Sequence, residues 1–223
     1  MTESSTLSSA EDLSESIVLV GGGGHACALL DVLKALDRWE VIGLLDPALE
    51  PATDRYGVPV LGGDDALRPL VERGCSVAIG VGQTTTTSPR HALFQRLREM
   101  GASLPAIVST RAYVSPRARL GPAAQVLHGA IVNADASIGA NTIINSRALV
   151  EHEAAIGADC HIATGAIVNG RSSVGPRSFI GSGAVVLHSL QLSSDVAVGA
   201  GAVVTASLPA PGTYVGVPAK ALP

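Results

Sequence analysis

The chain is poor in the features that mark several common protein classes. Only 3% of its 223 residues are aromatic and 15% are charged, and its net charge is −4. Because it has no excess of basic residues, it lacks the electrostatic footprint that nucleic acids and anionic membrane surfaces attract. Its three cysteines, Cys27, Cys75 and Cys160, follow no motif spacing, which argues against a disulfide framework or a zinc site. These absences predict a small-molecule partner, no bound metal and a cytoplasmic location.

No apolar run in the sequence approaches the length of a membrane span, so we expect no membrane partner. The first sixteen residues are polar and acidic, unlike a signal peptide, and residues 1–16 are predicted to form a disordered tail. Aliphatic side chains and glycine are abundant instead, with 47% hydrophobic residues and 25 Gly. A core built from Ala, Val, Ile and Leu suits thin, regular layers.

The first half of the chain alternates aliphatic runs with segments of helical periodicity. Strands that alternate with helices indicate βαβ units and a parallel sheet. We therefore predict a small Rossmann-like α/β domain over residues 17–106. The expected strands are 17–20, 41–45, 58–61, 77–81 and 104–108, and the expected helices lie within 27–36, 65–72 and 90–100.

In the second half a period of six replaces the helical period. Every sixth residue from Val108 to Val204 is aliphatic, the residue four places later is usually small, and glycine often follows the aliphatic residue. A strict six-residue repeat is typical of a β-helix whose coils stack on one another. We predict a left-handed parallel β-helix over residues 107–208, with three hexads per coil, and a C-terminal cap over 209–223. A β-sandwich would show strands of period two and turns of varying length.

Three segments carry a resemblance to a known family. They are Val20–His25 with its four glycines, the central Val150-Glu151-His152-Glu153, and the closing Gly216–Lys220. With the hexads between them, they resemble the sialic-acid O-acetyltransferase family, which includes N-acetyltransferases acting on nucleotide-linked 4-amino sugars. The resemblance implies a homotrimer in which acetyl-CoA and a nucleotide-sugar meet in a cleft between adjacent β-helices.

The repeat arithmetic places one candidate catalytic residue. His152 lies two residues after Val150, at a corner, and Gly170 lies one coil of eighteen residues later, so Gly170 should stack beside His152. Acetyl transfer needs a base for the attacking group and a donor for the oxyanion. On the repeat alone, His152 is also compatible with an ordinary solvated corner residue, since His128 and His188 occupy the same hexad position.

The resemblance assigns roles to further residues. It implies that His152 is the general base, that Glu153 is the carboxylate that orients it, and that the amide of Gly170 contacts the acetyl oxygen. The residues that it implies for acetyl-CoA binding are His161, Gly170, Ser182, Ala200 and Lys220. A simple cap over the last coil is an alternative role for the segment that contains Lys220.

A glycine-rich turn follows the first expected strand and opens a helix. Such a turn offers backbone amides to a phosphate at a helix N-terminus. A dinucleotide cofactor is disfavoured because the domain is too short for two mononucleotide halves. By resemblance, this loop and the acid after the second strand hold the nucleotide-sugar, although Pro47 stands where relatives often have a second acid and Thr84–Thr87 depart from the usual pattern. The expected substrate-binding residues are Gly22, Gly23, Gly24, His25 and Asp46.

Several alternatives stay open at this level. Cys160 falls in a small-residue corner position and is interpreted as buried filler with an inert thiol. His91 is expected on a helix surface. A carbonic-anhydrase-like zinc site would need closely spaced histidine ligands, and the chain has no His-x4-His pair. For function, we predict an N-acetyltransferase, with a sugar O-acetyltransferase or a non-catalytic nucleotide-sugar-binding trimer as rivals.

Overall fold

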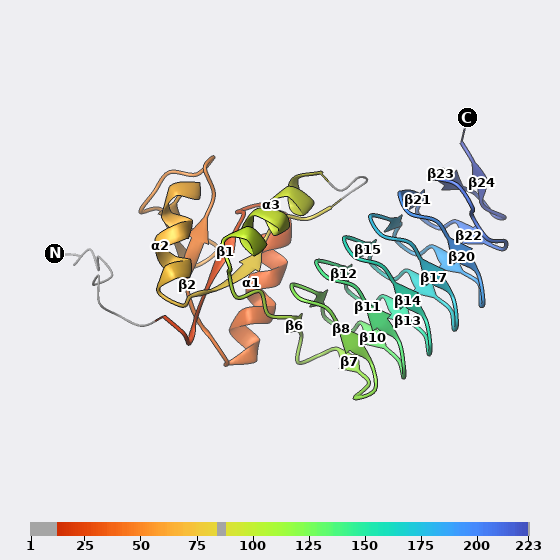
Figure 1. The fold of residues 1–223 in the computed structure, drawn as a ribbon, viewed down its shortest axis with the longest axis horizontal. Helices are drawn as coiled ribbons and strands as arrows, with labels where there is room; N and C mark the ends of the chain where they lie inside the picture. The colour runs from red at the N-terminus through yellow and green to blue at the C-terminus, as the bar shows by residue number, and fades with distance from the viewer. Residues whose placement is uncertain (1–12, 84–87, 223) are drawn as a thin grey trace.

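The computed structural model describes residues 13–83 and 88–222. The expected tail falls mainly in residues 1–12, and Thr84–Thr87 belong to the second gap, so both predictions lie outside the described residues there. Figure 1 shows two parts, an N-terminal α/β domain and a β-helix whose coils lead away from it to the C-terminus. The predicted fold class is confirmed. Within the described ranges, no helix is long and apolar enough to cross a bilayer.

The N-terminal domain is a five-stranded sheet with helices on both faces. The strand order is β3-β4-β2-β1-β5, parallel except for the β3–β4 pair. Ile17 and Leu19 pack under α1, whereas Val18 and Val20 face α2 and α3, as the alternation of side chains along a strand requires. The elements are β1 (Ser16–Val20), α1 (Gly24–Leu36), β2 (Glu40–Leu45), β3 (Asp54–Arg55), β4 (Val58–Gly62), η1 (Asp64–Ala66), α2 (Leu67–Glu72), β5 (Ser76–Ile79) and α3 (Ser88–Glu99).

Two expectations for this domain need correction. The predicted tail includes residues 13–16, but Leu13 is buried in the domain core and its N–H donates to the carbonyl of Arg73, and β1 already begins at Ser16. The run 104–108 is predicted to be a strand of the sheet. Leu104 does pack into the domain core, but Ile107–Val108 form β6, the first strand of the β-helix, which begins at the residue predicted for its start. An aliphatic run cannot itself say which of two adjoining sheets it joins.

The β-helix has three flat faces, each a parallel sheet of short strands that pair with strands eighteen residues away. The first face contains β6 (Ile107–Val108), β9 (Gln125–Val126), β12 (Ile143–Ile144), β15 (His161–Ile162), β18 (Phe179–Ile180), β21 (Val196–Val198) and the cap strands β23 (Gly212–Val215) and β24 (Lys220–Ala221). The second contains β7 (Tyr113–Val114), β10 (Ile131–Val132), β13 (Leu149–Val150), β16 (Ile167–Val168), β19 (Val185–Val186) and β22 (Val203–Val204). The third contains β8 (Arg119–Leu120), β11 (Ser137–Ile138), β14 (Ala155–Ile156), β17 (Ser173–Val174) and β20 (Gln191–Leu192).

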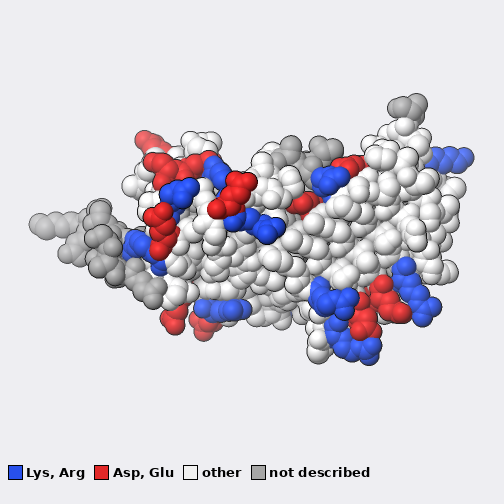
Figure 2. Space-filling view, viewed as in Figure 1, with Lys and Arg blue, Asp and Glu red and all other residues white. Residues whose placement is uncertain are grey.

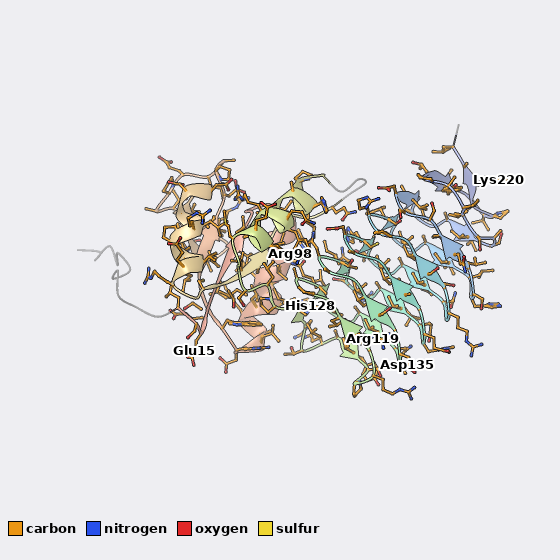
Figure 3. All side chains as sticks on the ribbon, in the orientation of Figure 1. Glu15, Arg98, Arg119, His128, Asp135 and Lys220 are labelled. Atoms are coloured by element: carbon orange, nitrogen blue, oxygen red, sulfur yellow. The ribbon has the colours of Figure 1, made fainter. Side chains whose placement is uncertain are left out.

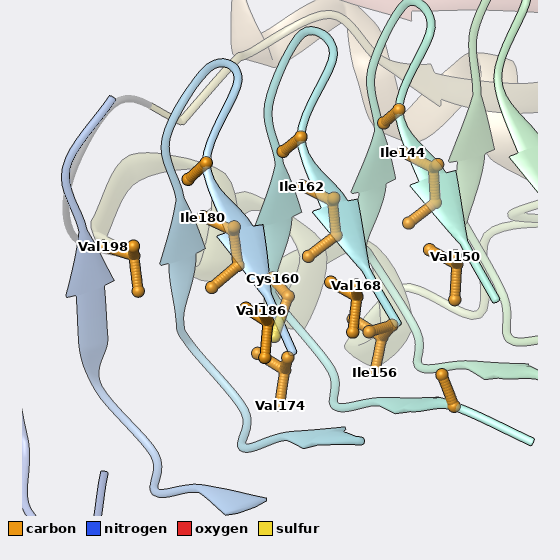
Figure 4. Close-up of a cluster of buried hydrophobic side chains, with 14 of the residues drawn as sticks. Ile144, Val150, Ile156, Cys160, Ile162, Val168, Val174, Ile180, Val186 and Val198 are labelled. Carbon is orange, nitrogen blue, oxygen red and sulfur yellow. The ribbon is translucent and has the colours of Figure 1, made fainter. Parts of the chain in front are cut away.

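The repeated aliphatic residue of each hexad forms the core of the prism. Figure 4 shows these side chains converging from the three faces in stacked rows, with Ile144, Ile162 and Ile180 in one row. From Val126 to Val204 all fourteen of these positions are buried, as the period of six predicted. The small residue four places later, such as Ala148 or Ala166, is also fully buried. The corners between faces therefore leave room only for small side chains inside.

Charged side chains gather along the corners. Residues eighteen apart stack there and pair, as Arg117 does with Asp135 and Arg171 with Glu153. Figure 2 shows charges of both signs at the lower edge of the β-helix, where Figure 3 labels Asp135. Exposed ion pairs of this kind contribute little stability, about 0–1 kcal/mol each. They mark the outside of a corner, and the candidate active site lies on the same corner.

Candidate active site

The residues predicted to carry the chemistry lie together at one corner of the β-helix. His152 is in the turn after β13, and Gly170 stacks on it one coil later, with the N–H of Arg171 donating to the carbonyl of His152 at 3.1 Å. A Cβ atom built on Gly170 would lie 2.8 Å from both Cε1 and Nε2 of His152. Any larger residue at this position would therefore push the imidazole out of its place. The predicted contact between His152 and Gly170 is confirmed.

A cavity of about 520 Å³ opens at this corner. His188, predicted to lie on the same edge two coils beyond His152, also lines it. The amide N–H of Gly170 donates to no acceptor in the described part of the chain, whereas the next amide, that of Arg171, is already bonded. An N–H without an acceptor, in a residue that lies beside a histidine ring, is a suitable donor for a developing oxyanion. The cavity is lined by Glu151, His152, Asn169, Gly170, Arg171, His188 and Ser189.

The hydrogen bonds of His152 define its reactive nitrogen. Its Nδ1–H donates to Oε2 of Glu153 at 3.1 Å, because a carboxylate only accepts. Nε2 is then the basic nitrogen, and it lies against Gly170 together with Cε1. Glu153 has a φ of 59°, a left-handed conformation that turns its side chain back toward His152. The pair has the arrangement of a base held in one tautomer by a carboxylate.

Three further residues support this pair, and the sequence assigns no role to them. Oε2 of Glu151 accepts from Asn133 Nδ2 at 3.0 Å and from the N–H of His152 at 3.2 Å, which fixes the turn. Arg171 donates from Nε to Oε2 of Glu153 at 3.1 Å. The hydrogen bonds from His152 and from Arg171 lower the pKa of Glu153, so the carboxylate stays charged near neutral pH. The eighteen-residue spacing of Asn133 from Glu151 and of Glu153 from Arg171 is the signal that could have found them.

Two of the residues expected to bind acetyl-CoA lie at a different corner. Ser182 and Ala200 are exposed and stack one coil apart, with the N–H of Gly201 donating to the carbonyl of Ser182. Their corner precedes the second face, whereas the corner of His152 follows it. Within one chain the two corners are thus separated by the full width of that face. Figure 3 labels Lys220, exposed in β24, at the end of the β-helix far from the N-terminal domain.

The loop expected to bind the nucleotide-sugar lies at the carboxyl edge of the N-terminal sheet. The N–H of Gly22 donates to Oδ2 of Asp46 at 2.7 Å, so these two predicted residues are in contact. Gly23 and Gly24 are exposed, with open space around their Cα atoms, and α1 begins there without a side-chain cap. Their amides are the ones a phosphate can reach. Gly22 and Asp46 shape the loop, and their contact with the substrate stays a prediction.

A second cavity, of about 430 Å³, opens at the same edge. It is mainly apolar, which suits a nucleoside, and it carries Asp46, Asp64 and Arg96 as its charged residues. Arg96 donates from Nη1 to Asp64 at 2.5 Å, and this bond lowers the pKa of Asp64. No residue that lines this cavity also lines the cavity at His152. The cavity is lined by Val20, Gly21, Leu45, Asp46, Pro47, Asp64, Val81, Pro89, Ala92, Leu93 and Arg96.

The junction between the two domains holds the remaining predicted histidines. His161 on β15 is only 7% exposed; its Nδ1 donates to the carbonyl of Gln83 at 2.5 Å, and its Nε2 accepts from Asn145 at 2.9 Å. Burial lowers its pKa. His161 follows His152 by nine residues, half of one coil, and this spacing predicts that the two do not lie side by side within one chain. The structure agrees, since His152 follows the second face and His161 is on the first. Both of its nitrogens are bonded within the chain, and its expected contact with acetyl-CoA stays a prediction.

His91 is not simply a surface residue as expected. Its Nδ1 lies 3.0 Å from Oδ2 of Asp159, a buried carboxylate of the β-helix, so α3 is tied to the second domain there. Nearby, Arg90 is fully buried and donates to the carbonyls of Ile79, Val81 and Asn141. The junction-facing side of α3 thus carries an arginine and a histidine, which helical periodicity alone does not reveal.

The alternative chemistries find little support at these positions. Cys160 is fully buried in a corner of the prism, and burial raises the pKa of its thiol to about 12, so the thiolate that a nucleophile needs is not formed near neutral pH. Over residues 13–83 and 88–222, no three His, Cys, Asp or Glu side chains are arranged to hold a metal ion.

Comparison with known proteins places this geometry in context. Residues 16–97 match the model of the PglD N-terminal domain family. PerB from Caulobacter crescentus, solved in complex with CoA and GDP-perosamine, is 38% identical; the match covers 93% of this chain and 97% of that one, with a TM-score of 0.85. The acetyltransferase domain of PglB from Neisseria gonorrhoeae, solved in complex with acetyl coenzyme A, is 30% identical. The match covers 94% of this chain and 100% of that one, with a TM-score of 0.88.

WeeI from Acinetobacter baumannii is 25% identical, with a TM-score of 0.82, over 93% of this chain and 99% of its own. No curated protein sequence matches the chain. The structural matches over nearly the whole chain include acetyltransferases, so the chain is an acyltransferase with a hexapeptide β-helix. The chain belongs to the family of acetyltransferases that contains the perosamine N-acetyltransferase of Caulobacter crescentus and the acetyltransferase domain of PglB. The narrower sialic-acid O-acetyltransferase placement stays a prediction.

Proposed function

We propose that this protein transfers the acetyl group of acetyl-CoA directly to the amino group of a nucleotide-linked amino-deoxysugar, with His152 as general base. The observation that carries the proposal is the corner where Nε2 of His152 faces Gly170, whose N–H has no acceptor within the described ranges. Its family members include enzymes solved with CoA and GDP-perosamine or with acetyl coenzyme A. Two structures of the Caulobacter enzyme carry a substituted histidine, which supports a histidine as an important residue in this family.

The residues of the corner divide the chemistry between them. Bound acetyl-CoA would supply a thioester, whose carbonyl carbon the sugar amine attacks. Nε2 of His152 takes the proton that the amine loses, and Glu153 stabilises the resulting imidazolium through Nδ1. The N–H of Gly170 donates to the carbonyl oxygen as it becomes negative. When the carbon–sulfur bond breaks, the proton on His152 is available to the leaving thiolate, so the cycle needs no covalent enzyme intermediate.

The acceptor side of the reaction belongs to the N-terminal domain. We assign the nucleoside to the apolar 430 Å³ cavity and the diphosphate to the open amides of Gly23 and Gly24. Asp46, fixed by its bond to Gly22, supplies an acceptor for a hydroxyl or a base N–H at the cavity edge.

The three cysteines of the described chain are all free thiols, which supports a cytoplasmic location.

We further propose a homotrimer, because the second face of the β-helix is apolar on its outside. The outward residue of each strand there is apolar, and two of these residues, Tyr113 and Ile131, are 55% and 39% exposed. On the third face the corresponding residues include Arg119, Ser137 and Gln191. The apolar row would be Tyr113, Ile131, Leu149, Ile167, Val185 and Val203.

The two edges of this apolar face carry the two sets of predicted residues. The corner of His152 borders one edge, and the corner of Ser182 and Ala200 borders the other. Head-to-tail packing of three copies through this face would bring the His152 corner of one copy toward the Ser182 corner of the next. The acetyl-CoA cleft would then form between chains, as the family resemblance implies.

The assembly has its own test with a matched control. Ile131→Glu puts a charge on the apolar face, and Ser137→Glu puts the same charge on the neighbouring polar face. Light scattering after size exclusion should give a trimer for wild type and Ser137→Glu, and a monomer for Ile131→Glu. A monomeric wild-type protein, or a trimeric Ile131→Glu, would contradict the proposed interface.

The reaction is tested by release of CoA thiol from acetyl-CoA. The acceptors are GDP-perosamine and a UDP-linked 4-amino-deoxysugar, each beside an analogue with a hydroxyl in place of the amine. We expect rapid thiol release with an amine acceptor and at least about a hundredfold less with its hydroxyl analogue, since the alcohol is a poorer neutral nucleophile. Faster reaction with the hydroxyl analogue would identify an O-acetyltransferase, and no release with any acceptor would favour a non-catalytic binding trimer.

A further inference from the structure

His25 is a half-buried histidine at the start of α1 that the proposed reaction does not use directly. Its Nε2 lies 2.7 Å from Oε1 of Gln125, a buried residue of β9. The contact therefore joins the glycine-rich loop of the N-terminal domain to the first face of the β-helix. Gly82 makes room for it, since a Cβ atom there would lie 3.2 Å from Cβ of His25.

The orientation of the Gln125 amide is fixed by a third group. Nε2 of Gln125 donates to the carbonyl of Ile79 at 2.8 Å, and a carbonyl only accepts. Oε1 of Gln125 must therefore be the atom that faces His25, and it is an acceptor. It follows that Nε2 of His25 carries the proton and donates it, and that Nδ1 of His25 is an unprotonated acceptor.

His161 provides an internal contrast because the same reasoning gives the opposite tautomer. Oδ1 of Asn145 accepts from the N–H of Ser146 at 2.7 Å, so Nδ2 of Asn145 must donate to Nε2 of His161. His161 carries its proton on Nδ1 and donates it to Gln83. Both nitrogens of His161 are used. Nδ1 of His25, in contrast, has no hydrogen-bond partner within residues 13–83 and 88–222.

The charges around His25 keep its ring neutral. The groups that act on it are the guanidinium of Arg90 from α3, His161 from β15 and the uncharged amide of Gln125 from β9. Burial, followed by the positive charge of Arg90, lowers the pKa of His25 to about 4, although the bond to Gln125 acts in the opposite direction. Near neutral pH the imidazole is uncharged and its Nδ1 lone pair is available.

We propose that Gln125 is a positioning residue that presets His25 as a neutral imidazole whose Nδ1 accepts a hydrogen bond from the nucleotide-sugar. The proposal rests on the proposed function, because it places the acceptor substrate at the loop that contains Gly23, Gly24 and His25. Because Nδ1 of His25 only accepts, it favours a hydroxyl or amine of the substrate and disfavours an anionic group at that nitrogen, while the phosphates are assigned to the neighbouring amides of Gly23 and Gly24. A residue of the β-helix thereby sets the specificity of the N-terminal domain.

The tautomer is measured without substrate, by long-range ¹H–¹⁵N correlation spectra of ¹⁵N-histidine-labelled protein at pH 7. The His25 signals are assigned by their loss in His25→Asn and those of His161 by their loss in His161→Asn. We expect a neutral ring protonated on Nε2 for His25 and one protonated on Nδ1 for His161. A His25 ring protonated on Nδ1, or a charged ring at pH 7, would overturn the proposal.

Two substitutions of Gln125 then test its effect on the substrate. Gln125→Met removes the acceptor at similar volume, and Gln125→Glu faces His25 with a carboxylate that stabilises the charged ring. In both variants the carbonyl of Ile79 keeps its bond from Arg90. The measured quantities are KM for GDP-perosamine or the UDP-linked amino sugar, whichever turns over, and KM for acetyl-CoA, at pH 6 to 8. Dividing each variant KM by the wild-type KM at the same pH cancels protonation of the substrate amine.

For Gln125→Glu we expect the ratio of the variant KM to the wild-type KM for the nucleotide-sugar to rise by about fivefold or more from pH 8 to pH 6. A change of this size corresponds to the net free energy of about one hydrogen bond. For Gln125→Met the ratio should be raised at every pH without a slope. The KM for acetyl-CoA should stay within about twofold of wild type in both. A flat ratio in Gln125→Glu, or equal effects on both substrates, would show a merely structural role. If no acceptor turns over, the proposed function fails while the tautomer measurement still decides the role of Gln125.

Discussion

The two domains of this protein place their functional residues in different ways. In the β-helix, residues of the active corner are neighbours because they are eighteen apart, so His152 meets Gly170 and Glu153 meets Arg171 by the period alone. In the N-terminal domain, the groups that meet come from unrelated segments, as Gly22 does with Asp46. In a periodic region, the sequence spacing thus predicts which residues are in contact. In a non-periodic region, the contacts depend on how the helices and strands pack.

The largest effect should come from changing the length of the β-helix. Deleting residues 167–184 removes one coil and leaves the later aliphatic residues Val186, Leu192, Val198 and Val204 pointing inward, whereas deleting 167–183 shifts these four by one position and turns them outward. We expect the first variant to fold, with a melting temperature lower by roughly 10 °C or less, and the second to be insoluble or unfolded. Circular dichroism and thermal melts check this, and equal behaviour of the two would contradict a strict period.

The next largest effect should come from filling the space beside His152. Gly170→Ala and Gly170→Val add one and three carbons at a position where a Cβ atom would lie 2.8 Å from the imidazole. Because the ring must move away from the acetyl group, we expect kcat to fall by about tenfold for alanine and about a hundredfold or more for valine. The melting temperature serves as the control for folding. Wild-type kcat in the valine variant would mean that the ring does not act at this position.

A smaller effect should follow from removing the charge of Glu153. Glu153→Gln keeps the shape but no longer stabilises the imidazolium, so kcat should fall by about tenfold, less than for a buried carboxylate because solvent screens the pair. Asp135→Asn is the matched control, since Asp135 stacks one coil earlier at the same corner and pairs with Arg117 outside the cavity. Equal losses in the two variants would indicate a general effect of corner charge.

These expectations also show how much of the molecule was predictable. The fold, the contact of His152 with Gly170 and the burial of Cys160 followed from spacing, because each coil repeats the same backbone path. The bond of Asn133 to Glu151 shares that spacing, but which polar side chains pair depends on their rotamers.

The junction between the domains was not predictable from spacing. Its contacts join residues from three elements that share no period. Arg90 and Gln125 both donate to the carbonyl of Ile79, and His25 contacts Gln125. Only the packing of the two domains brings these residues together. For the same reason, the aliphatic run 104–108 does not show that it is divided, with Leu104 in the core of the first domain and Ile107 in the first strand of the β-helix. Polar side chains that serve a junction look like ordinary surface residues in a helical pattern, as His91 does.

The smallest effect concerns the stability of that junction at low pH. Burial lowers the pKa of His25 to about 4 and also lowers that of His161. Below about pH 6.5 the unfolded chain then binds more protons than the folded chain, so stability is fully present above that pH and is lost as the pH falls toward 4. Between pH 6 and 4.5 we expect the free energy of unfolding to fall by roughly 1 kcal/mol per pH unit.

Urea denaturation at several pH values measures this dependence. His25→Gln should give a shallower slope than wild type, because it removes one of the two buried groups that stay neutral in the folded chain and take up a proton on unfolding. His188→Gln, in an exposed turn, should leave the slope unchanged. A wild-type stability that does not vary over this range would mean that the two buried rings are hydrated.

In the proposed reaction, the six-residue period sets His152 in place as the base for acetyl transfer. Its most direct test is kcat for thiol release by His152→Ala at saturating acetyl-CoA and amino-sugar nucleotide, compared with wild type. We predict a loss of about 10²- to 10⁴-fold, with the KM for acetyl-CoA and the melting temperature nearly unchanged. A kcat close to that of wild type would contradict the assignment.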